Sequence, residues 1–104
     1  DHQANKLAKR FDANTYIALT EAMNSHDIGR GRGGVAAALE SITVPVMVLS
    51  IDTDRLFPPR LQAEVADLAP HAAPVETITS PFGHDGFLVE VESVGAVVRK
   101  ALAL

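Results

Sequence analysis

Val44-Pro-Val-Met-Val-Leu-Ser-Ile51 is a continuous apolar run that is rich in β-branched residues. Continuous rather than alternating hydrophobicity predicts a strand covered on both faces, as in a parallel sheet. Pro45 fits only near the start of such a strand, because proline cannot donate a hydrogen bond to the sheet. The run therefore predicts a buried strand of an α/β domain.

The residues after this run predict the order β-α-β-α. Pro58-Pro59 opens a helix that ends before Pro70, and Val75-Glu-Thr-Ile-Thr79 predicts a second, shorter strand. Residues 87–104 predict a terminal helix with one apolar stripe, made of Leu88, Val91, Val94, Val98 and Leu102. Right-handed crossovers would make the two strands parallel neighbours, with functional loops at their C-terminal ends.

Two strands cannot form a stable, doubly covered sheet alone, so both need partners that this chain lacks. Upstream of them, residues 11–23 predict a helix capped by Asp12 or Asn14, and residues 35–41 fit a short Ala-rich helix. Arg30-Gly-Arg-Gly-Gly34 between these helices reads either as a solvated linker or as a loop reaching toward an anion such as a phosphate. It lacks the P-loop pattern.

Composition excludes several classes of protein. The 104 residues fit one small domain or part of a larger one, and 47% hydrophobic residues are too many for a disordered chain. A net charge of −4 gives no support to nucleic-acid binding, and the absence of cysteine excludes a disulfide framework. No apolar run approaches the roughly 18 residues of a membrane span. With a polar start and no signal peptide, the expectation is no membrane and a cytoplasmic location.

An acid and a histidine follow the two predicted strands. Asp54 comes after the first strand and His84 after the second, which brings them to one edge of a parallel sheet. Histidine can accept a proton from a hydroxyl near neutral pH and return it, provided that an acid holds its other ring nitrogen. Asp54 is the better candidate for that acid. Asp52 is a rival, which could instead pair with Arg55 or cap the next helix.

This order matches the second and third members of a Ser-Asp-His triad, as an α/β-hydrolase sheet presents them. The chain contains no Gly-x-Ser-x-Gly, so the nucleophile is not visible. Structural alternatives remain open: Asp54 could be a turn or N-cap residue, and His84 an exposed turn histidine. A metal site of His84, Asp85 and Asp54 lacks a second histidine at ligand spacing, and we predict no metal.

Four stretches together resemble the homoserine O-acetyltransferases, which are members of the α/β-hydrolase superfamily. They are Arg10-Phe-Asp-Ala-Asn-Thr-Tyr16, Asp27-Ile-Gly-Arg-Gly-Arg32, Thr53-Asp-Arg-Leu-Phe-Pro58 and Phe82-Gly-His-Asp85. The first stretch is the most specific, since the last two occur widely in that superfamily. The resemblance covers essentially the whole chain and implies that it is the C-terminal part of such an enzyme.

The resemblance implies a ping-pong transfer of acetyl from acetyl-CoA to the hydroxyl of L-homoserine in methionine biosynthesis. His84 would be the general base and acid, Asp54 its orienting partner, and Asp85 the residue that holds the substrate's amino group. The alternative for Asp85 is a brace of the turn that accepts from backbone N–H groups. No cofactor is implied, because acetyl-CoA is a co-substrate.

The resemblance also implies a division of the chain. Residues 1–34 would be the end of a helical lid segment with the Gly/Arg-rich loop, and residues 35–104 the C-terminal part of the α/β-hydrolase core. The expected partners are the N-terminal part of the enzyme, which supplies the nucleophile, and a second copy that forms a homodimer through the lid helices. The chain alone is therefore expected to be inactive. Alternatives are a fragment of a related serine or homoserine acyltransferase, a serine hydrolase fragment, and a non-catalytic remnant.

Overall fold

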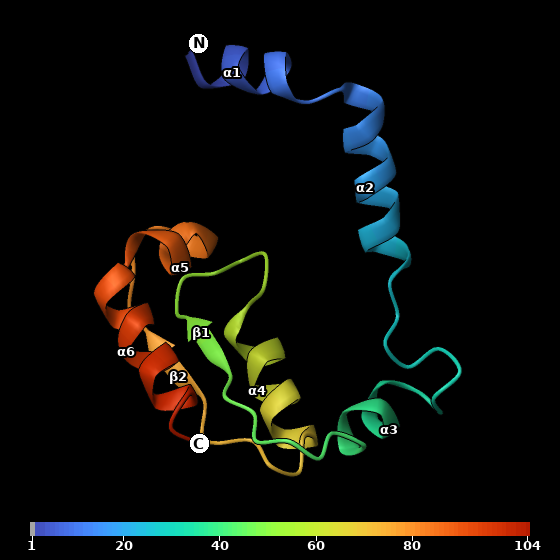
Figure 1. The fold of residues 1–104 in the computed structure, drawn as a ribbon, viewed down its shortest axis with the longest axis vertical. Helices are drawn as coiled ribbons and strands as arrows, with labels where there is room; N and C mark the ends of the chain where they lie inside the picture. The colour runs from blue at the N-terminus through green and yellow to red at the C-terminus, as the bar shows by residue number, and fades with distance from the viewer. Residues whose placement is uncertain (1) are drawn as a thin grey trace.

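Two short parallel strands form the sheet of the computed structural model, which describes residues 2–104 (Figure 1). β1 spans Leu49–Ile51 and β2 spans Glu76–Ile78, with Ser50 opposite Thr77. A parallel bridge joins Val46 to Ala72 upstream of this pair. The predicted parallel pairing is confirmed, but the strands are shorter than predicted, because regular pairing extends only where the two segments lie side by side.

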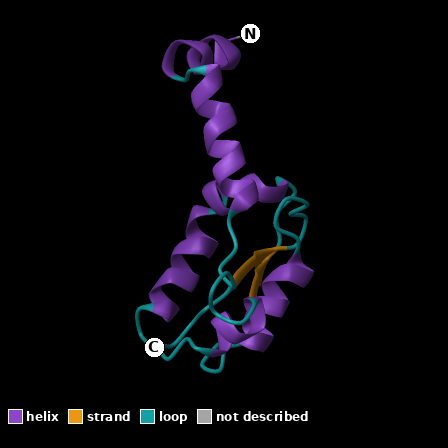
Figure 2. Ribbon diagram, turned by 90° about the vertical axis from the view of Figure 1, so that its right-hand side faces the viewer, coloured by secondary structure: helices purple, strands orange, loops and turns teal. Residues whose placement is uncertain are grey.

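Helices lie on both sides of this sheet (Figures 1 and 2). α4, Pro59–Leu68, contacts β1, and α6, Val91–Ala101, contacts β2. α4 begins with proline at its first helical position, where the missing N–H costs nothing, and it ends at Leu68, two residues before Pro70, as predicted. The short helix α3, Val35–Glu40, packs against α4. The predicted β-α-β-α order is present.

The hydrophobic core lies between the sheet and α6. Ile51 of β1, Ile78 of β2 and Val97 of α6 form a buried cluster, against which Met47, Leu49 and Val94 pack. Within the apolar run, Val48 and Ile51 are buried but Val44 is exposed, so the predicted covering on both faces is only partly present in this chain. Because Ile51 and Ile78 are also paired across the ladder, the core and the ends of both strands are one unit.

The predicted terminal helix is broken at Glu90 (φ −83°, ψ 57°) into α5, Gly86–Val89, and α6. Of the predicted stripe, Val94 packs against the core, whereas Leu88, Val91, Val98 and Leu102 are exposed. The break separates only Leu88 from the rest of the stripe, and the buried residue of α6 is Val97, which the stripe left out. Within α6 itself, Val94 and Val97 are three residues apart and share the face toward the sheet.

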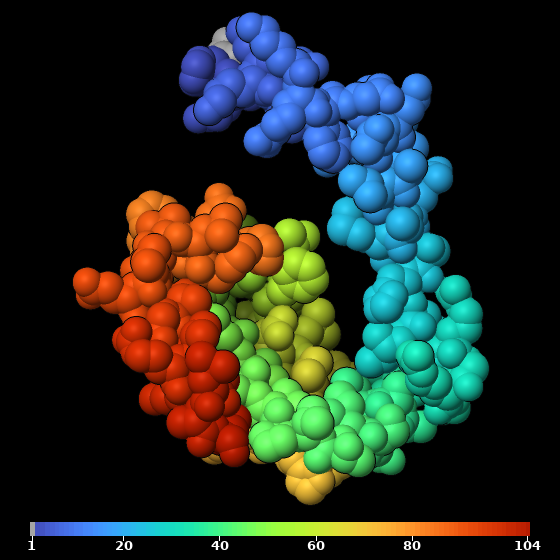
Figure 3. Space-filling view, in the orientation of Figure 1, coloured from blue at the N-terminus to red at the C-terminus, as the bar shows by residue number. Residues whose placement is uncertain are grey.

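The N-terminal arm, residues 2–34, extends away from the sheet (Figures 1 and 3). It contains α1, His2–Arg10, and α2, Ala13–Ser25. α2 is close to its predicted bounds, and the Asp12 carboxylate caps it by accepting from the Asn14 N–H at 3.3 Å. α1 was not predicted from the sequence. Neither helix contains a buried residue, and Asp1, the first residue of the predicted lid segment, lies outside the described residues.

The Gly/Arg-rich loop at the end of the arm is held by its own arginines. The Arg30 guanidinium donates to the Ser25 carbonyl at 2.7 Å, and that of Arg32 donates to the Ile28 carbonyl at 2.9 Å. Positive φ angles at three of its glycines allow the tight path: Gly31, Gly33 and Gly34. Among residues 2–104, no helix is both long and apolar enough to span a bilayer.

Candidate active site

Asp54 and His84 meet at the C-terminal edge of the sheet. Asp54 follows β1, His84 lies in the 3₁₀ turn Gly83–Asp85 after β2, and Asp54 Oδ2 is 2.8 Å from His84 Nδ1. The Asp54 side chain is 6% exposed and that of His84 is 36% exposed. This contact is the one that the order of strands and loops predicts. The catalytic role of the pair stays a prediction.

The two carboxylate oxygens of Asp54 have different partners. Oδ2 contacts His84, while Oδ1 accepts from the backbone N–H groups of Leu56 and Phe57 at 2.9 Å each. Asp54 is therefore both a turn residue, as the structural alternative proposed, and the partner of His84. The two N–H groups fix the carboxylate, and this in turn fixes where the imidazole can bind.

Asp52, the rival acid, does not contact His84. Its carboxylate accepts from the Ser80 N–H at 3.0 Å and so joins the loop after β1 to the loop after β2. Neither Arg55 nor the next helix takes it as a partner. Asp52 therefore ties together the two loops that carry Asp54 and His84.

Thr53 and Ser80 brace the turn that carries His84. The Thr53 hydroxyl donates to the Ser80 carbonyl and accepts from the Gly83 N–H at 2.9 Å. The Ser80 hydroxyl accepts from the Phe82 N–H at 3.3 Å. Gly83 has φ +60°, a conformation that side chains disfavour. Sequence reasoning missed these braces, because their partners lie in different loops and leave no local pattern.

The pKa of Asp54 is lowered from its ordinary value. Burial acts to raise this pKa, but hydrogen bonds from the Phe57 N–H, the His84 ring and the Leu56 N–H together outweigh burial. The attraction of a charged His84 lowers it further. Asp54 is thus held as a carboxylate beside the histidine. This is the state needed to orient an imidazole and to stabilise an imidazolium.

A hollow of about 410 Å³ opens beside the pair. His84 lines it together with residues from β1, α4 and α5 and the loop after β1: Leu49, Ser50, Ile51, Asp54, Phe57, Gln62 and Phe87. The Ser50 hydroxyl in this lining is buried and has no hydrogen-bond partner among residues 2–104. A buried hydroxyl without a partner is costly, and a polar group that bonds to Ser50 would remove that cost.

Asp85, the predicted substrate-binding residue, is exposed, and its carboxylate has no hydrogen bond or ion pair among residues 2–104. The alternative in which Asp85 accepts from backbone N–H groups of its turn is not seen in this structure. Asp85 precedes α5 directly, so it is carried by the same turn as His84. Among the described residues, no group of three His, Cys, Asp or Glu side chains is placed to hold a metal ion.

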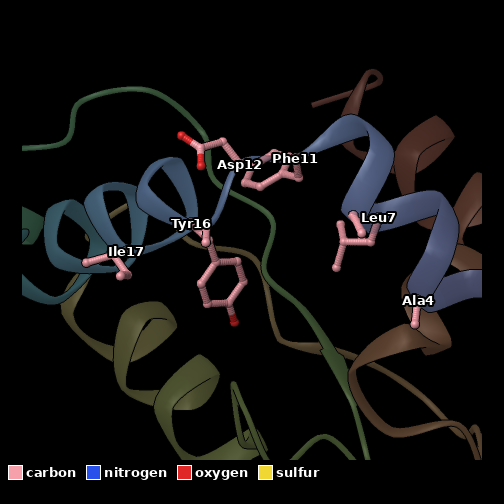
Figure 4. Close-up of a pocket in the computed structure, with 8 residues that line it drawn as sticks. Ala4, Leu7, Phe11, Asp12, Tyr16 and Ile17 are labelled. Carbon is pink, nitrogen blue, oxygen red and sulfur yellow. The ribbon is translucent and has the colours of Figure 1, made fainter.

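A second hollow, of about 620 Å³, lies in the bend between α1 and α2 (Figure 4). Its lining is mostly apolar: Ala4, Leu7, Ala8, Phe11, Asp12, Ala13, Tyr16 and Ile17. Tyr16 and Ile17 are more than half exposed there. Exposed apolar side chains of this size in one concave patch are typical of a surface that another chain segment covers.

The whole chain aligns with curated homoserine O-acetyltransferases of mycobacteria. It is 58% identical over 104 residues to those of Mycobacterium bovis (strain BCG / Pasteur 1173P2) and Mycobacterium tuberculosis (strain ATCC 25177 / H37Ra), and 52% identical to that of Mycobacterium leprae (strain TN). All of this chain is aligned in each case, but it spans only 27% of the length of these relatives. No family model matches the chain. The resemblance seen in the sequence is confirmed.

Proposed function

We propose that this chain is the C-terminal part of a homoserine O-acetyltransferase, to which it contributes Asp54 and His84 of a Ser-Asp-His triad. The observation that carries the proposal is the 2.8 Å contact between Asp54 Oδ2 and His84 Nδ1 at the edge of a parallel sheet. Identity of 58% over the whole chain to named homoserine O-acetyltransferases supports the acyl donor and acceptor. The nucleophilic serine would come from the rest of the protein.

In the first half-reaction, the serine oxygen attacks the thioester carbonyl of acetyl-CoA. His84 Nε2 accepts the serine proton as the new C–O bond forms. The C–S bond then breaks, and His84 returns the proton to the sulfur of the departing CoA. Asp54 holds Nδ1 throughout, so the free nitrogen stays directed to the reacting atoms.

In the second half-reaction, the hydroxyl of L-homoserine attacks the acetyl-serine. His84 accepts the proton of that hydroxyl and gives it to the serine oxygen as the acyl C–O bond to serine breaks. The products are O-acetylhomoserine and the free enzyme, which suits a step of methionine biosynthesis in the cytoplasm. Asp85, exposed and without a partner beside His84, would accept a charge-assisted hydrogen bond from the ammonium group of homoserine.

The proposal includes a division of the chain. Residues 35–104 would complete an α/β-hydrolase core whose other strands lie in the N-terminal part of the protein. Residues 1–34 would be the end of a helical lid, and a second copy would cover the hollow between α1 and α2 to form a homodimer. The exposed apolar side chains of Tyr16 and Ile17 support a covered surface there.

The test is the product formed by the full-length protein that contains this chain. It should be incubated with acetyl-CoA or succinyl-CoA and with homoserine, serine or water as acceptor, and the products separated by chromatography. Acetylhomoserine from acetyl-CoA is the expected main product. Acetate as the main product would make the protein a hydrolase, and succinyl transfer or serine acetylation would identify a related acyltransferase. No product at all would indicate a remnant without activity.

A further inference from the structure

Two phenylalanine rings contact the imidazole of His84. The ring centroid of Phe57 lies 5.0 Å from that of His84 with planes inclined at 44°, and the centroid of Phe87 lies 5.1 Å away at 56°. Both distances fall within the range of tilted aromatic pairs. Phe57 comes from the loop after β1 and Phe87 from α5, so His84 is contacted by one ring from each of these two segments.

Phe57 touches both members of the Asp54–His84 pair. Its N–H donates to Asp54 Oδ1 at 2.9 Å, and its ring contacts His84. Pro58 follows directly and caps α4 with φ −65°, the angle to which its ring restricts it. The position of the Phe57 ring is therefore set by rigid backbone on one side and by the carboxylate turn on the other.

One hydrogen bond does not fix an imidazole. The contact with Asp54 holds Nδ1, but the ring can still tilt about that contact and move Nε2. Nε2 makes no hydrogen bond among residues 2–104, so no polar group of the described chain restrains it. The rings of Phe57 and Phe87 contact the imidazole and can restrain this tilt.

We propose that Phe57, together with Phe87, is a positioning residue that holds the His84 ring in line with Asp54 and directs Nε2 into the hollow. The catalytic consequence rests on the proposed function. The two rings are 52% and 42% exposed and line the hollow, so they also cover the apolar faces of the imidazole on the side where the rest of the protein would bring its serine.

A competing role for the same rings is contact with the substrate. An apolar wall that binds the acyl group or the CoA arm would alter KM, whereas a residue that orients His84 would alter kcat, because both half-reactions need the same nitrogen in place. The two roles also differ in a spectroscopic property: only positioning changes the state of the imidazole when no substrate is present.

The test uses the full-length protein with ¹⁵N-labelled histidine and three variants. Phe57→Leu keeps an apolar side chain but loses the ring, Phe57→Tyr keeps the ring, and Leu88→Ala is the control. Leu88 is 63% exposed and does not line the hollow. The proton on His84 Nδ1 is observed by NMR and assigned by its loss in His84→Ala, and kcat and KM are measured for acetyl transfer.

In Phe57→Leu, the Nδ1 proton signal should broaden or exchange with water, and kcat should fall roughly tenfold or more with KM little changed. Phe57→Tyr should restore both, and Leu88→Ala should resemble the unaltered protein. An unchanged Nδ1 signal in Phe57→Leu would overturn the proposal, whether or not KM rises. If Phe57→Leu does not fold, Phe87→Leu removes the other ring and is judged by the same criteria.

The NMR measurement separates this proposal from the proposed function. If the protein transfers no acetyl group but Phe57→Leu still frees the Nδ1 proton, positioning holds and the acetyltransferase assignment fails. If acetyl transfer is observed but the Nδ1 proton is unaffected by the loss of either ring, the assignment holds and positioning by Phe57 and Phe87 fails.

Discussion

Residues 2–34 and residues 35–104 differ in how many of their apolar side chains are buried within the chain itself. All buried hydrophobic side chains of the described chain lie between Ala38 and Val97, whereas α1 and α2 contain no buried residue. Yet both regions contain regular helices with recognisable caps. Local signals such as the Asp12 cap are thus enough to define a helix, while burial depends on a partner.

The two hollows, one in each region, differ in the same way. The hollow beside His84 is held by hydrogen bonds between two loops, through Asp52, Thr53 and Asp54. The hollow between α1 and α2 is bounded mainly by apolar side chains of one continuous segment. The first is therefore a preformed site, and the second is a surface whose occupant we place in another copy of the chain.

The largest expected effect on stability comes from core truncation. Ile51→Ala, at a side chain only 4% exposed, should lower the free energy of unfolding of the full-length protein by about 2–5 kcal/mol at any protein concentration. Ile17→Ala in the arm, where the side chain is 53% exposed, should act only through dimerisation, so its effect should depend on concentration. Urea denaturation at two protein concentrations measures both. An equal, concentration-independent loss for Ile17→Ala would place the arm in the core of one subunit.

The next effect concerns specificity at the preformed site. In the full-length protein, Asp85→Asn should slow transfer from the acetyl-enzyme to homoserine by roughly 10- to 200-fold, the rate equivalent of a lost charge-assisted hydrogen bond of about 1.5–3 kcal/mol. Acylation by acetyl-CoA should survive, because it involves no ammonium group. Rapid-quench kinetics resolve the two halves. Equal slowing of both halves would make Asp85 a structural residue.

Two glycines with similar φ test whether backbone strain matters only at the site. Gly83 has φ +60° and Gly31, in the arm, has φ +71°. Alanine at either position should cost about 1–2 kcal/mol of stability, because the left-handed region is unfavourable for residues with a Cβ. Only Gly83→Ala should also lower activity, since Gly83 donates to Thr53 in the turn that carries His84. Thermal denaturation and acetyl-transfer rates of both variants provide the comparison, and equal activity losses would contradict it.

The smallest effect is a dependence of stability on pH. The pKa of Asp54 is lowered from 3.8 in the folded chain, so its carboxylate stabilises the fold at pH values above 3.8. That contribution should be lost as the pH falls below 3.8 and through the lowered pKa. In Asp54→Asn, the free energy of unfolding should therefore fall less steeply as the pH decreases below 3.8. Denaturation of the full-length protein at pH 7, 5 and 3 measures the slope. An unchanged slope would show that Asp54 is not the group responsible.

The sequence predicted the parts of the molecule that depend on local pattern and on chain order. The parallel pairing, α4 and the meeting of Asp54 with His84 follow from an apolar run, a proline pair and two strand ends. The sequence favoured Asp54 over Asp52 as the acid that holds His84, but it left open that Asp54 is only a turn or N-cap residue. The structure shows that Asp54 combines a turn role with its contact to the histidine.

Other features could not be read from the sequence for physical reasons. The break at Glu90 is a backbone conformation that leaves no apolar pattern, and the spacing of the stripe does not show which of its flanks faces the sheet, so buried Val97 was missed. The braces from Thr53 to Ser80 and Gly83 join loops that are distant along the chain. α1 was missed, although Ala4, Leu7, Ala8 and Phe11 recur at helical spacing and would have indicated it.

The central claim is that His84 moves the proton on which acylation depends. The direct measurement is the rate at which the full-length protein forms an acetyl-enzyme from acetyl-CoA alone, followed by mass spectrometry after rapid quench. His84→Ala should slow it by roughly a thousandfold or more. His71→Ala, which removes an exposed histidine outside the site, should leave it unchanged. Acylation of His84→Ala at the rate of the unaltered protein would contradict the account.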